Sequence, residues 1–473
     1  MSSPITVVIL AAGLGTRMKS KKAKVLHHAG GVPIVEHVVA TALAVAPPDR
    51  IFVVVGRQAA EVEAALSGYG VRFVQQPEQR GTADALLACR EALSGCHGPL
   101  LVLYGDCPLF TVGSLQQLVQ THARGDAAAT VVTTLLEDPT GYGRVLRDET
   151  GMVRAIVEHK DATPHQLAVR EINSGIYCFP SHLLWKHLAE IQPNNAAREW
   201  YLTDIVAIFR RAGHLMQPLL LADPLEVLGI NTRADLALAD RVLRERKARQ
   251  LMLDGVTIEK PETVTIDAGV MVGADTILGP FAQLLGRTAI GEDCSIGACS
   301  IIRDSQLAAG VVVAPFSMVD SCQLESGVRV GPYARLRMGA YLESGAVVGN
   351  FVEVKKSRLG AKTKSQHLAY LGDATIGQGV NVGAGAITCN YDGERKHPTT
   401  IGDGAFIGSN STLVAPVEIG AGSYVAAGSV ITDAVPPGAL ALGRARQVVK
   451  EDWAKKRKAR KSGEAPAHST TIG

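Results

Sequence analysis

In the stretch Ile290-Gly-Glu-Asp-Cys-Ser-Ile296-Gly-Ala-Cys-Ser-Ile-Ile302, an aliphatic residue returns every six positions with turn-forming residues between. The same period runs through residues 266–302, 324–348 and 401–431. No α-helix has this spacing, whereas short strands joined at tight corners do. The repeat therefore predicts a parallel β-helix of about ten coils stacked about 4.8 Å apart, with three hexads in each coil. The period does not fix the handedness.

Length and composition indicate the number of domains and the classes of partner and compartment. A chain of 473 residues is too long for one core, so two or three domains are expected. A net charge of +3 predicts no electrostatic footprint for nucleic acid. The eight cysteines contain no C-x-x-C pair, which favours reduced thiols in a cytosol over disulfides or zinc. The apolar run from Val7 to Ala12 lacks a basic leader, so we expect a buried strand and no signal peptide. No apolar run is long enough to predict a membrane span.

The first half of the chain has a different pattern from the repeats. Apolar runs of β type alternate with helical segments, which predicts a mostly parallel sheet covered by helices. Residues 232–253 have apolar residues at helical spacing and arginines on the other face, which predicts a connecting helix with a solvated arginine face. We therefore expect a domain over 1–231, a linker helix over 232–253, a β-helix over 254–449 and a basic, partly disordered tail over 450–473.

Two motifs in the first domain are suited to phosphate chemistry. After a strand ending at Leu10, residues 11–18 read Ala-Ala-Gly-Leu-Gly-Thr-Arg-Met, and Lys24 follows. Backbone amides without bulky side chains cradle phosphates, and Arg17 and Lys24 would supply positive charge there. Gly105-Asp106 stands at the carboxyl end of another predicted strand, where a carboxylate suits Mg²⁺. A turn or helix cap is the competing explanation for an isolated Gly-Asp pair.

A second chemical region interrupts the hexads between Gly349 and Gly372. Four residues there and nearby offer cations and hydrogen-bond donors suited to a sugar phosphate: Arg337, Lys355, Tyr370 and Asn381. His367 stands among them. An isolated histidine is more often structural, and no further histidines are spaced for metal ligation.

These motifs resemble known families. The hexads resemble the repeats of acyltransferases whose β-helix is left-handed, and the string around Lys24 resembles the signature of sugar-nucleotide pyrophosphorylases, with Ala23 in place of a proline. Both motif sets in order, from Leu10 to Trp453, resemble the bacterial family of bifunctional N-acetylglucosamine-1-phosphate uridyltransferases and glucosamine-1-phosphate N-acetyltransferases. The resemblance implies an α/β nucleotidyltransferase domain, Rossmann-like with a mostly parallel sheet, followed by a left-handed parallel β-helix of hexapeptide repeats.

In the first domain the resemblance makes Asp106 and Asn231 the Mg²⁺ ligands and Arg17 and Lys24 catalytic. It implies that the uracil is read by the segment containing Gln76 and Gly81-Thr82. The full set of implied nucleotide- and sugar-binding residues is Leu10, Ala11, Ala12, Gly13, Lys24, Gln76, Gly81, Thr82, Tyr104, Gly105, Asp106, Gly143, Glu158, Asn173 and Asn231. Ser174 replaces a threonine of the family and keeps its hydroxyl.

In the repeat domain the resemblance makes His367 the general base, the proton acceptor of the acetyl transfer. The sugar phosphate would be bound by Arg337, Lys355, Tyr370 and Asn381. Acetyl-CoA would be bound by Ala384, Asn390, Tyr391, Ser409, Ala427 and Arg444. Two departures, Met338 for proline and Ala369 for serine or threonine, leave these charged and ring groups intact.

The implied function is synthesis of UDP-N-acetylglucosamine for the bacterial cell envelope. Acetyl-CoA would acetylate glucosamine-1-phosphate, and Mg²⁺-dependent uridyl transfer from UTP would follow with release of pyrophosphate. The resemblance also implies a cytoplasmic homotrimer with active sites between subunits, and no nucleic-acid partner. The residues alone leave two other functions open: a pyrophosphorylase whose β-helix only trimerises or regulates, and a scaffold without enzymatic activity.

Overall fold

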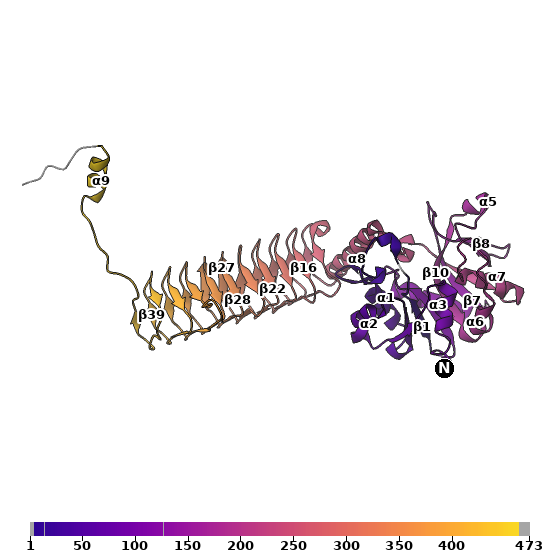
Figure 1. Cartoon of the computed structure of the whole chain (residues 1–473), viewed down its shortest axis with the longest axis horizontal. Coiled ribbons are helices and arrows are strands. Elements are labelled where there is room, and N and C mark those ends of the chain that lie inside the picture. Colours follow the sequence, from indigo (N-terminus) through magenta and orange to yellow (C-terminus); the bar gives the residue numbers. More distant parts are fainter. Residues whose placement is uncertain (1–3, 14, 126, 463–473) are drawn as a thin grey trace, which may run out of the picture. The chain divides into compact units, whose positions relative to one another are not determined.

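The computed structural model describes residues 4–13, 15–125 and 127–462 (Figure 1). Contacts divide the chain into two compact units. The first comprises Met1–Glu292 and Ile301–Asp304, and the second comprises Asp293–Ser300 and Ser305–Gly473. The first coils of the β-helix thus belong with the α/β domain.

A nine-stranded, mostly parallel sheet lies at the centre of the first unit. Its main path runs β11 (Met216–Leu221), β7 (Ala129–Leu135), β10 (Glu171–Pro180), β6 (Pro99–Tyr104), β1 (Thr6–Leu10), β4 (Ile51–Val55) and β5 (Arg72–Gln75). β10 runs antiparallel to β6 and β7, whereas β1 is parallel to β4 and β6. β8 (Arg144–Arg147) and β9 (Val153–Val157) form a hairpin beside β10.

Helices cover both faces of this sheet because its strands are apolar on both sides. In β1, Val7 and Ile9 pack into one core cluster and Val8 into the other. The first cluster includes residues of α1 (Ile34–Leu43), α2 (Ala59–Leu66) and α4 (Val112–Arg124). The second includes residues of α3 (Thr82–Ala88), α6 (Ser181–His187) and α7 (Ile205–Arg211). Alternate residues of each strand therefore serve the two layers.

The connecting helix α8 (Arg233–Leu253) begins with a capping box between Thr232 and Asp235. The prediction of a solvated arginine face is wrong for two of its arginines. Arg244 donates to Asp240 at 2.9 Å and to Asp267 at 2.7 Å, and Arg246 donates to the Leu109 carbonyl oxygen at 2.7 Å. Sequence spacing could not reveal these partners because Asp267 belongs to the first coil. The helix is therefore tied to both the α/β domain and the beginning of the β-helix.

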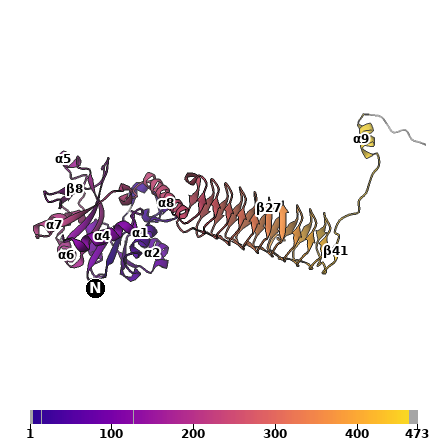
Figure 2. The ribbon, with the colours of Figure 1, turned by 180° about the vertical axis from the view of Figure 1, so that it is seen from behind.

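The repeats form three parallel sheets, which are the faces of a triangular prism. Figures 1 and 2 show the stacked coils from two sides. The first face has 11 strands from β12 (Thr257–Ile258) to β41 (Leu440–Ala441), the second has 10 from β13 (Thr265–Ile266) to β40 (Val430–Ile431), and the third has nine from β14 (Met271–Val272) to β38 (Val417–Ile419). From β12 to β40, successive strands occupy the first, second and third face in turn, and β41 returns to the first face. The predicted fold class of an α/β domain followed by a left-handed parallel β-helix is confirmed.

The hexad aliphatic residues fill the prism, as the period predicts. Ile290, Ile296 and Ile302 are buried, as are Leu336 and Val348. In the tail, which the sequence predicts to be partly disordered, residues Trp453–Lys461 form helix α9, and residues 463–473 lie outside the described part of the chain. No helix among the described residues is long and apolar enough to cross a bilayer.

Candidate active sites

A cleft of about 570 Å³ opens at the carboxyl ends of β1 and β6. The structure gathers most of the predicted uridyltransferase residues in it: Leu10, Ala11, Ala12, Gly13, Lys24, Gln76, Gly81, Thr82, Tyr104, Asp106, Gly143, Glu158, Asn173 and Asn231. Two predicted residues lie beside the cleft wall. The Gly105 N–H donates to the Leu10 carbonyl oxygen at 2.9 Å, and Arg17 donates to Asn231 Oδ1 at 2.8 Å.

The glycine-rich loop packs closely against Lys24, which lines the cleft, because Gly15 has no side chain. Gly15 has a φ of +59°, and a Cβ on it would come within 2.6 Å of Lys24 Cβ. Only glycine allows this approach in the left-handed conformation. A short 3₁₀ helix, η1 (Thr16–Met18), follows and carries the exposed Arg17. The loop thus places two cations at one end of the cleft.

The two predicted metal ligands face the same cation. Lys24 Nζ donates to Asp106 Oδ2 and, at 3.3 Å, to Asn231 Oδ1. Two oxygen atoms that converge on one positive group fit a hard divalent cation such as Mg²⁺, which keeps water and phosphate oxygens in the rest of its shell. Among the described residues no cluster of three or more His, Cys, Asp or Glu side chains could hold a metal alone. The donor set therefore fits a metal that binds together with a phosphate substrate.

Other polar groups that line the cleft surround the place predicted for the sugar. Asn173 Oδ1 accepts hydrogen bonds from the Gly175 N–H and the Tyr177 hydroxyl, both at 3.0 Å, so the Asn173 amide NH₂ is left to donate to a ligand. A Cβ on Gly143 would come within 3.2 Å of Glu158 Oε1. Burial raises the pKa of Glu158, although a hydrogen bond from Thr203 opposes the shift.

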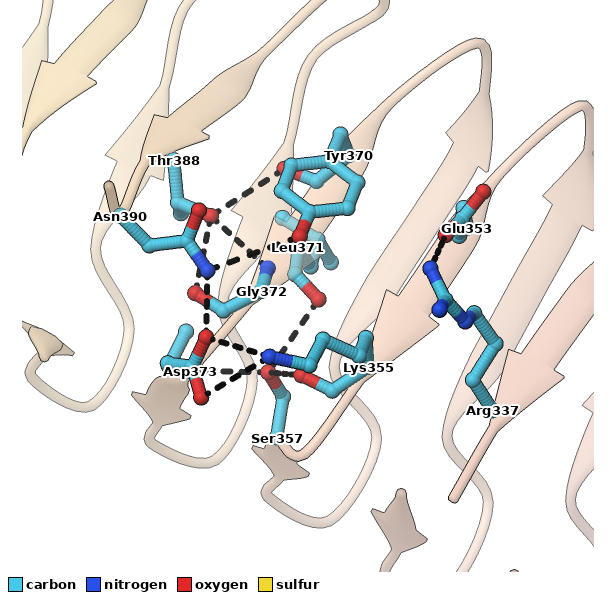
Figure 3. Close-up of polar contacts among 11 residues, drawn as sticks. Arg337, Glu353, Lys355, Ser357, Tyr370, Leu371, Gly372, Asp373, Thr388 and Asn390 are labelled. Carbon is cyan, nitrogen blue, oxygen red and sulfur yellow. Dashed lines mark hydrogen bonds and ion pairs between the residues drawn. The ribbon is translucent and has the colours of Figure 1, made fainter. Parts of the chain in front are cut away.

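The second site lies on the second face of the prism, on β25 (Arg335–Arg337), β28 (Glu353–Lys355) and β31 (Tyr370–Gly372). Lys355 Nζ donates to Asp373 at 2.9 Å, and Asn390 Nδ2 donates to the same carboxylate. Figure 3 shows these side chains converging near Tyr370. Arg337 lies on the neighbouring coil, on β25, and donates to Glu353 at 2.6 Å. The structure thus places Asn390, predicted to bind acetyl-CoA, beside residues predicted to bind the sugar phosphate.

The charged groups around Lys355 shift one another's pKa values. Burial alone would raise the pKa of Asp373, but hydrogen bonds from Lys355 and Asn390 outweigh it and hold the pKa below its ordinary value. A hydrogen bond with Lys396, followed by one with Asp373, raises the pKa of Lys355. The same contact with Lys355 lowers the pKa of Lys396. A bound phosphate would favour a positive charge on both lysines, so the cluster is suited to an anionic ligand.

His367 ends β30 (Lys364–His367) on the first face and is exposed. Its Nδ1 lies 3.1 Å from Asn350 Oδ1. With the amide oxygen as acceptor, Nδ1 carries the proton and the Nε2 lone pair is available as a base. Within a single chain, water therefore reaches this imidazole.

Four residues predicted to bind acetyl-CoA form a column along the corner between the first and second faces, which we call the first corner. The Asn410 N–H donates to the Ala384 carbonyl oxygen at 2.7 Å, and the Gly428 N–H donates to that of Ser409 at 2.8 Å. Arg444 donates to the Ala427 carbonyl oxygen at 2.7 Å. Ala384, Ser409 and Ala427 therefore occupy equivalent positions on successive coils. Tyr391 is exposed on the loop that follows Asn390.

Asn381 does not join the other predicted sugar-phosphate residues within one chain. It lies on β33 (Asn381–Val382) of the first face, whereas Arg337, Lys355 and Tyr370 lie on the second face. Outward side chains on two faces of a triangular prism diverge. A site that uses all four residues therefore needs surfaces of more than one prism.

Sequence reasoning missed several residues that belong to these sites. Asp373 and Lys396 contact Lys355, but neither was assigned a role. In the first unit, Asp84 contacts Gln76, and Gln79 and Tyr201 line the cleft. Asp373 could have been found from the sequence, because it directly follows Gly372, where the interruption of the hexads ends. No local signal pairs Asp84 with Gln76, because the contact depends on how the loop between them folds.

Comparisons with known proteins agree with this arrangement. Residues 7–252 match the MobA-like NTP transferase domain, and residues 269–304 and 398–433 match the bacterial transferase hexapeptide family. The chain is 57% identical to the bifunctional protein GlmU of Solibacter usitatus (strain Ellin6076) over 97% of this chain and 98% of that protein. It is 50% identical to the bifunctional protein GlmU of Anaeromyxobacter sp. (strain Fw109-5), covering 99% and 96%, and 49% identical to that of Koribacter versatilis (strain Ellin345), covering 96% and 97%.

Proposed function

The chain belongs to the family of bifunctional GlmU proteins, and from this premise we propose which residues carry its two reactions. It is a bifunctional enzyme with uridyltransferase and acetyltransferase activities. The α/β domain joins UMP from UTP to N-acetylglucosamine-1-phosphate, and the β-helix transfers the acetyl group of acetyl-CoA to glucosamine-1-phosphate. The convergence of Lys24, Asp106 and Asn231 in a cleft at the strand ends supports the first assignment most strongly.

In uridyl transfer a sugar phosphate oxygen attacks the α-phosphorus of UTP, and pyrophosphate leaves. Bound Mg²⁺, held by Asp106 and Asn231, would supply positive charge to the phosphates. Lys24 and Arg17 lie at the same end of the cleft and would offset the negative charge that the two substrates bring together. Asn173 and Glu158 would orient the sugar, and no nucleophilic side chain is needed.

In acetyl transfer the ammonium group of glucosamine-1-phosphate must lose a proton before its nitrogen can attack the thioester carbonyl carbon. His367 Nε2 accepts that proton, with Asn350 holding Nδ1–H. Lys355 and Arg337 bind the sugar phosphate. As the tetrahedral intermediate collapses, the C–S bond breaks and the nitrogen loses a second proton. The CoA thiolate takes up a proton, and the amide product remains.

Two assays on the full-length protein test this function. Pyrophosphate release is measured with UTP and N-acetylglucosamine-1-phosphate in the presence of Mg²⁺, and CoA release with acetyl-CoA and glucosamine-1-phosphate. We expect both activities. Release of pyrophosphate without any acetylation would instead favour a pyrophosphorylase whose β-helix is only a scaffold.

The acetyltransferase site is completed by neighbouring copies in a cytoplasmic homotrimer. Asn381 diverges from Lys355, and His367 is exposed, so each half of the site lacks an opposing wall. Before the acetyl-CoA column, the first corner carries exposed Phe316, Tyr333 and Phe351 on successive coils. Their rings stack with centroids 5.0 and 5.5 Å apart. We call this the aromatic ladder, and an exposed apolar row beside a site is typical of an interface.

Replacing Tyr333 and Phe351 by glutamate should therefore weaken the trimer. Each charge would have to lose its water in the interface, so we expect roughly a 10- to 100-fold weaker association for each substitution. Light scattering measures the oligomer, and both activities are assayed. Acetyl transfer should fall with the trimer while uridyl transfer persists.

Val448→Glu is the matched control, because Val448 is also exposed but lies beyond the last strand of the prism. It should leave the assembly unchanged. If the protein with both Tyr333→Glu and Phe351→Glu remains trimeric, the aromatic ladder is not part of the interface.

The proposed domain limits of 1–231, 232–253 and 254–449 predict that the two activities can be separated in fragments. The contacts of α8 with the first coil decide where the stable N-terminal fragment ends. A fragment 1–253 keeps the whole cleft but loses Asp267, and it also loses the Ala268 N–H that donates to the Gly30 carbonyl oxygen at 2.8 Å. We expect fragments 1–253 and 1–304 both to catalyse uridyl transfer. The shorter one should melt lower, by about 2–4 °C for each kcal/mol lost.

Thermal unfolding followed by circular dichroism measures this difference. Asp267→Ala in fragment 1–304 is the matched variant and should reproduce part of it. Equal melting temperatures of the two fragments would show that α8 does not depend on the first coil.

A further inference from the structure

The side-chain amide of Gln76 is held in one orientation at the uracil end of the cleft. Its Nε2 lies 2.8 Å from Asp84 Oδ2 and 3.3 Å from the Gly81 carbonyl oxygen. Both neighbours can only accept hydrogen bonds, so the Gln76 atom that faces them must be the NH₂ group. Gln76 and Asp84 are 3% and 9% exposed, which leaves little water to replace these partners.

The Asp84 carboxylate is itself fixed by a second donor. Arg80 donates to Asp84 Oδ1 from Nε at 3.2 Å and from Nη2 at 2.7 Å. The Arg80 guanidinium also lies over the Trp200 ring, 5.1 Å from its centroid. Each carboxylate oxygen therefore has its own partner, and neither is free to turn toward the ligand.

The backbone around this network is joined to the segment containing Trp200. The Trp200 N–H donates to the Arg80 carbonyl oxygen at 2.9 Å, and the Ala83 N–H donates to the Trp200 carbonyl oxygen at 3.0 Å. A Cβ on Gly81 would come within 2.4 Å of that carbonyl oxygen, so only glycine fits there. The loop that carries Arg80 and the helix turn that carries Asp84 are thus rigidly connected.

What remains of Gln76 for a ligand is its Oε1 atom. This oxygen accepts no hydrogen bond from the residues that the structure describes, and Gln76 lines the cleft. Uracil carries a proton on N3 and can donate it to Oε1. Cytosine has a lone pair at N3, so in the same position it would place two acceptors against each other.

We propose that Asp84, supported by Arg80, is a positioning residue that turns the Gln76 amide oxygen toward the base and thereby sets the preference for UTP over CTP. The inference rests on the proposed role of Gln76 in reading the base. With Asp84 ionised, the reversed amide is disfavoured because its oxygen would face a carboxylate and a carbonyl oxygen.

Asp84→Asn in the full-length protein tests this directly. Asparagine keeps the size of Asp84, but its amide can donate or accept, so Gln76 is no longer confined to one orientation. We expect the ratio of kcat/KM for UTP to that for CTP to fall by roughly 10- to 100-fold, the effect of an unmatched buried hydrogen bond. Acetyl transfer measured on the same sample should not change. Glu91→Gln, at an exposed carboxylate just beyond α3, is the matched control and should leave the ratio unchanged.

Two further variants separate the possible outcomes. Gln76→Met removes the reading group and should abolish the preference. If Gln76→Met keeps the preference, Gln76 does not read the base, and both the inference and the proposed role of Gln76 are wrong. If Gln76→Met loses it but Asp84→Asn keeps the wild-type ratio, the inference alone is overturned and Asp84 is merely structural. Should Asp84→Asn fail to fold, Arg80→Gln replaces it: a smaller fall in the same ratio supports the inference, and an unchanged ratio overturns it.

Discussion

Asp106→Ala should abolish uridyl transfer while acetyl transfer stays near its wild-type rate. The substitution removes the charged ligand of the proposed metal site and leaves the Asn231 amide oxygen alone there. Loss of the charge that offsets the phosphates should slow the reaction by about 10³-fold or more, the scale of electrostatic stabilisation in enzymes. Pyrophosphate release at saturating Mg²⁺ and CoA release on the same preparation measure the two rates.

The same substitution also removes the ion-pair partner of Lys24, so stability must be measured in parallel. The side chains of Lys24 and Asp106 are only 12% and 15% exposed, and an unpaired cation in such a place is destabilising. Asp106→Asn keeps a hydrogen-bond acceptor for Lys24 but not the charge, and it should also be inactive in uridyl transfer. Asp49→Ala, at an exposed aspartate of the same domain, is the control. A folded Asp106→Asn protein that releases pyrophosphate at the wild-type rate would contradict the metal assignment.

The fold was predictable because its determinants are periodic and local. A six-residue period places Ile290, Ile296 and Ile302 inside a prism whatever the rest of the chain does. Alternating strands and helices likewise specify a covered parallel sheet. The prediction that failed concerns a contact between distant parts of the chain. The spacing of Arg244 predicts a solvated side chain, and only the folded chain brings Asp267 to it.

That candidate site residues lie together was predictable where a short motif sets their positions, and their roles stay predictions. The loop after Leu10 brings Lys24 to the cleft through its own glycine, and motif order locates Asp106 and Asn231. The partners of these residues are set by tertiary packing instead. Asn390 and Asp373 meet on the second face, and Asn381 lies on a different face, because coil geometry rather than motif identity decides which side chains are neighbours.

His367→Ala should slow acetyl transfer by roughly 10²- to 10⁴-fold, the usual contribution of a general base, and leave uridyl transfer unchanged. Among the described residues, the imidazole has one hydrogen-bond partner, Asn350, on Nδ1. The base that the mutant loses is therefore Nε2. Raising the pH should partly rescue the mutant, because more of the substrate amine is then already neutral. CoA release followed over a pH series measures both effects.

A structural histidine would behave differently in three measurements. It would change the assembly state, would show no rescue at high pH, and would affect KM as much as kcat, whereas a general base acts on kcat. His182→Ala, at an exposed histidine of α6, is the matched control and should change neither activity. Asn350→Ala should give an intermediate loss, since it frees the imidazole to rotate but keeps the base. A trimeric His367→Ala protein that acetylates normally would show that the proton leaves to another group, and Lys396, whose pKa is already lowered by Lys355, would be the next residue to test.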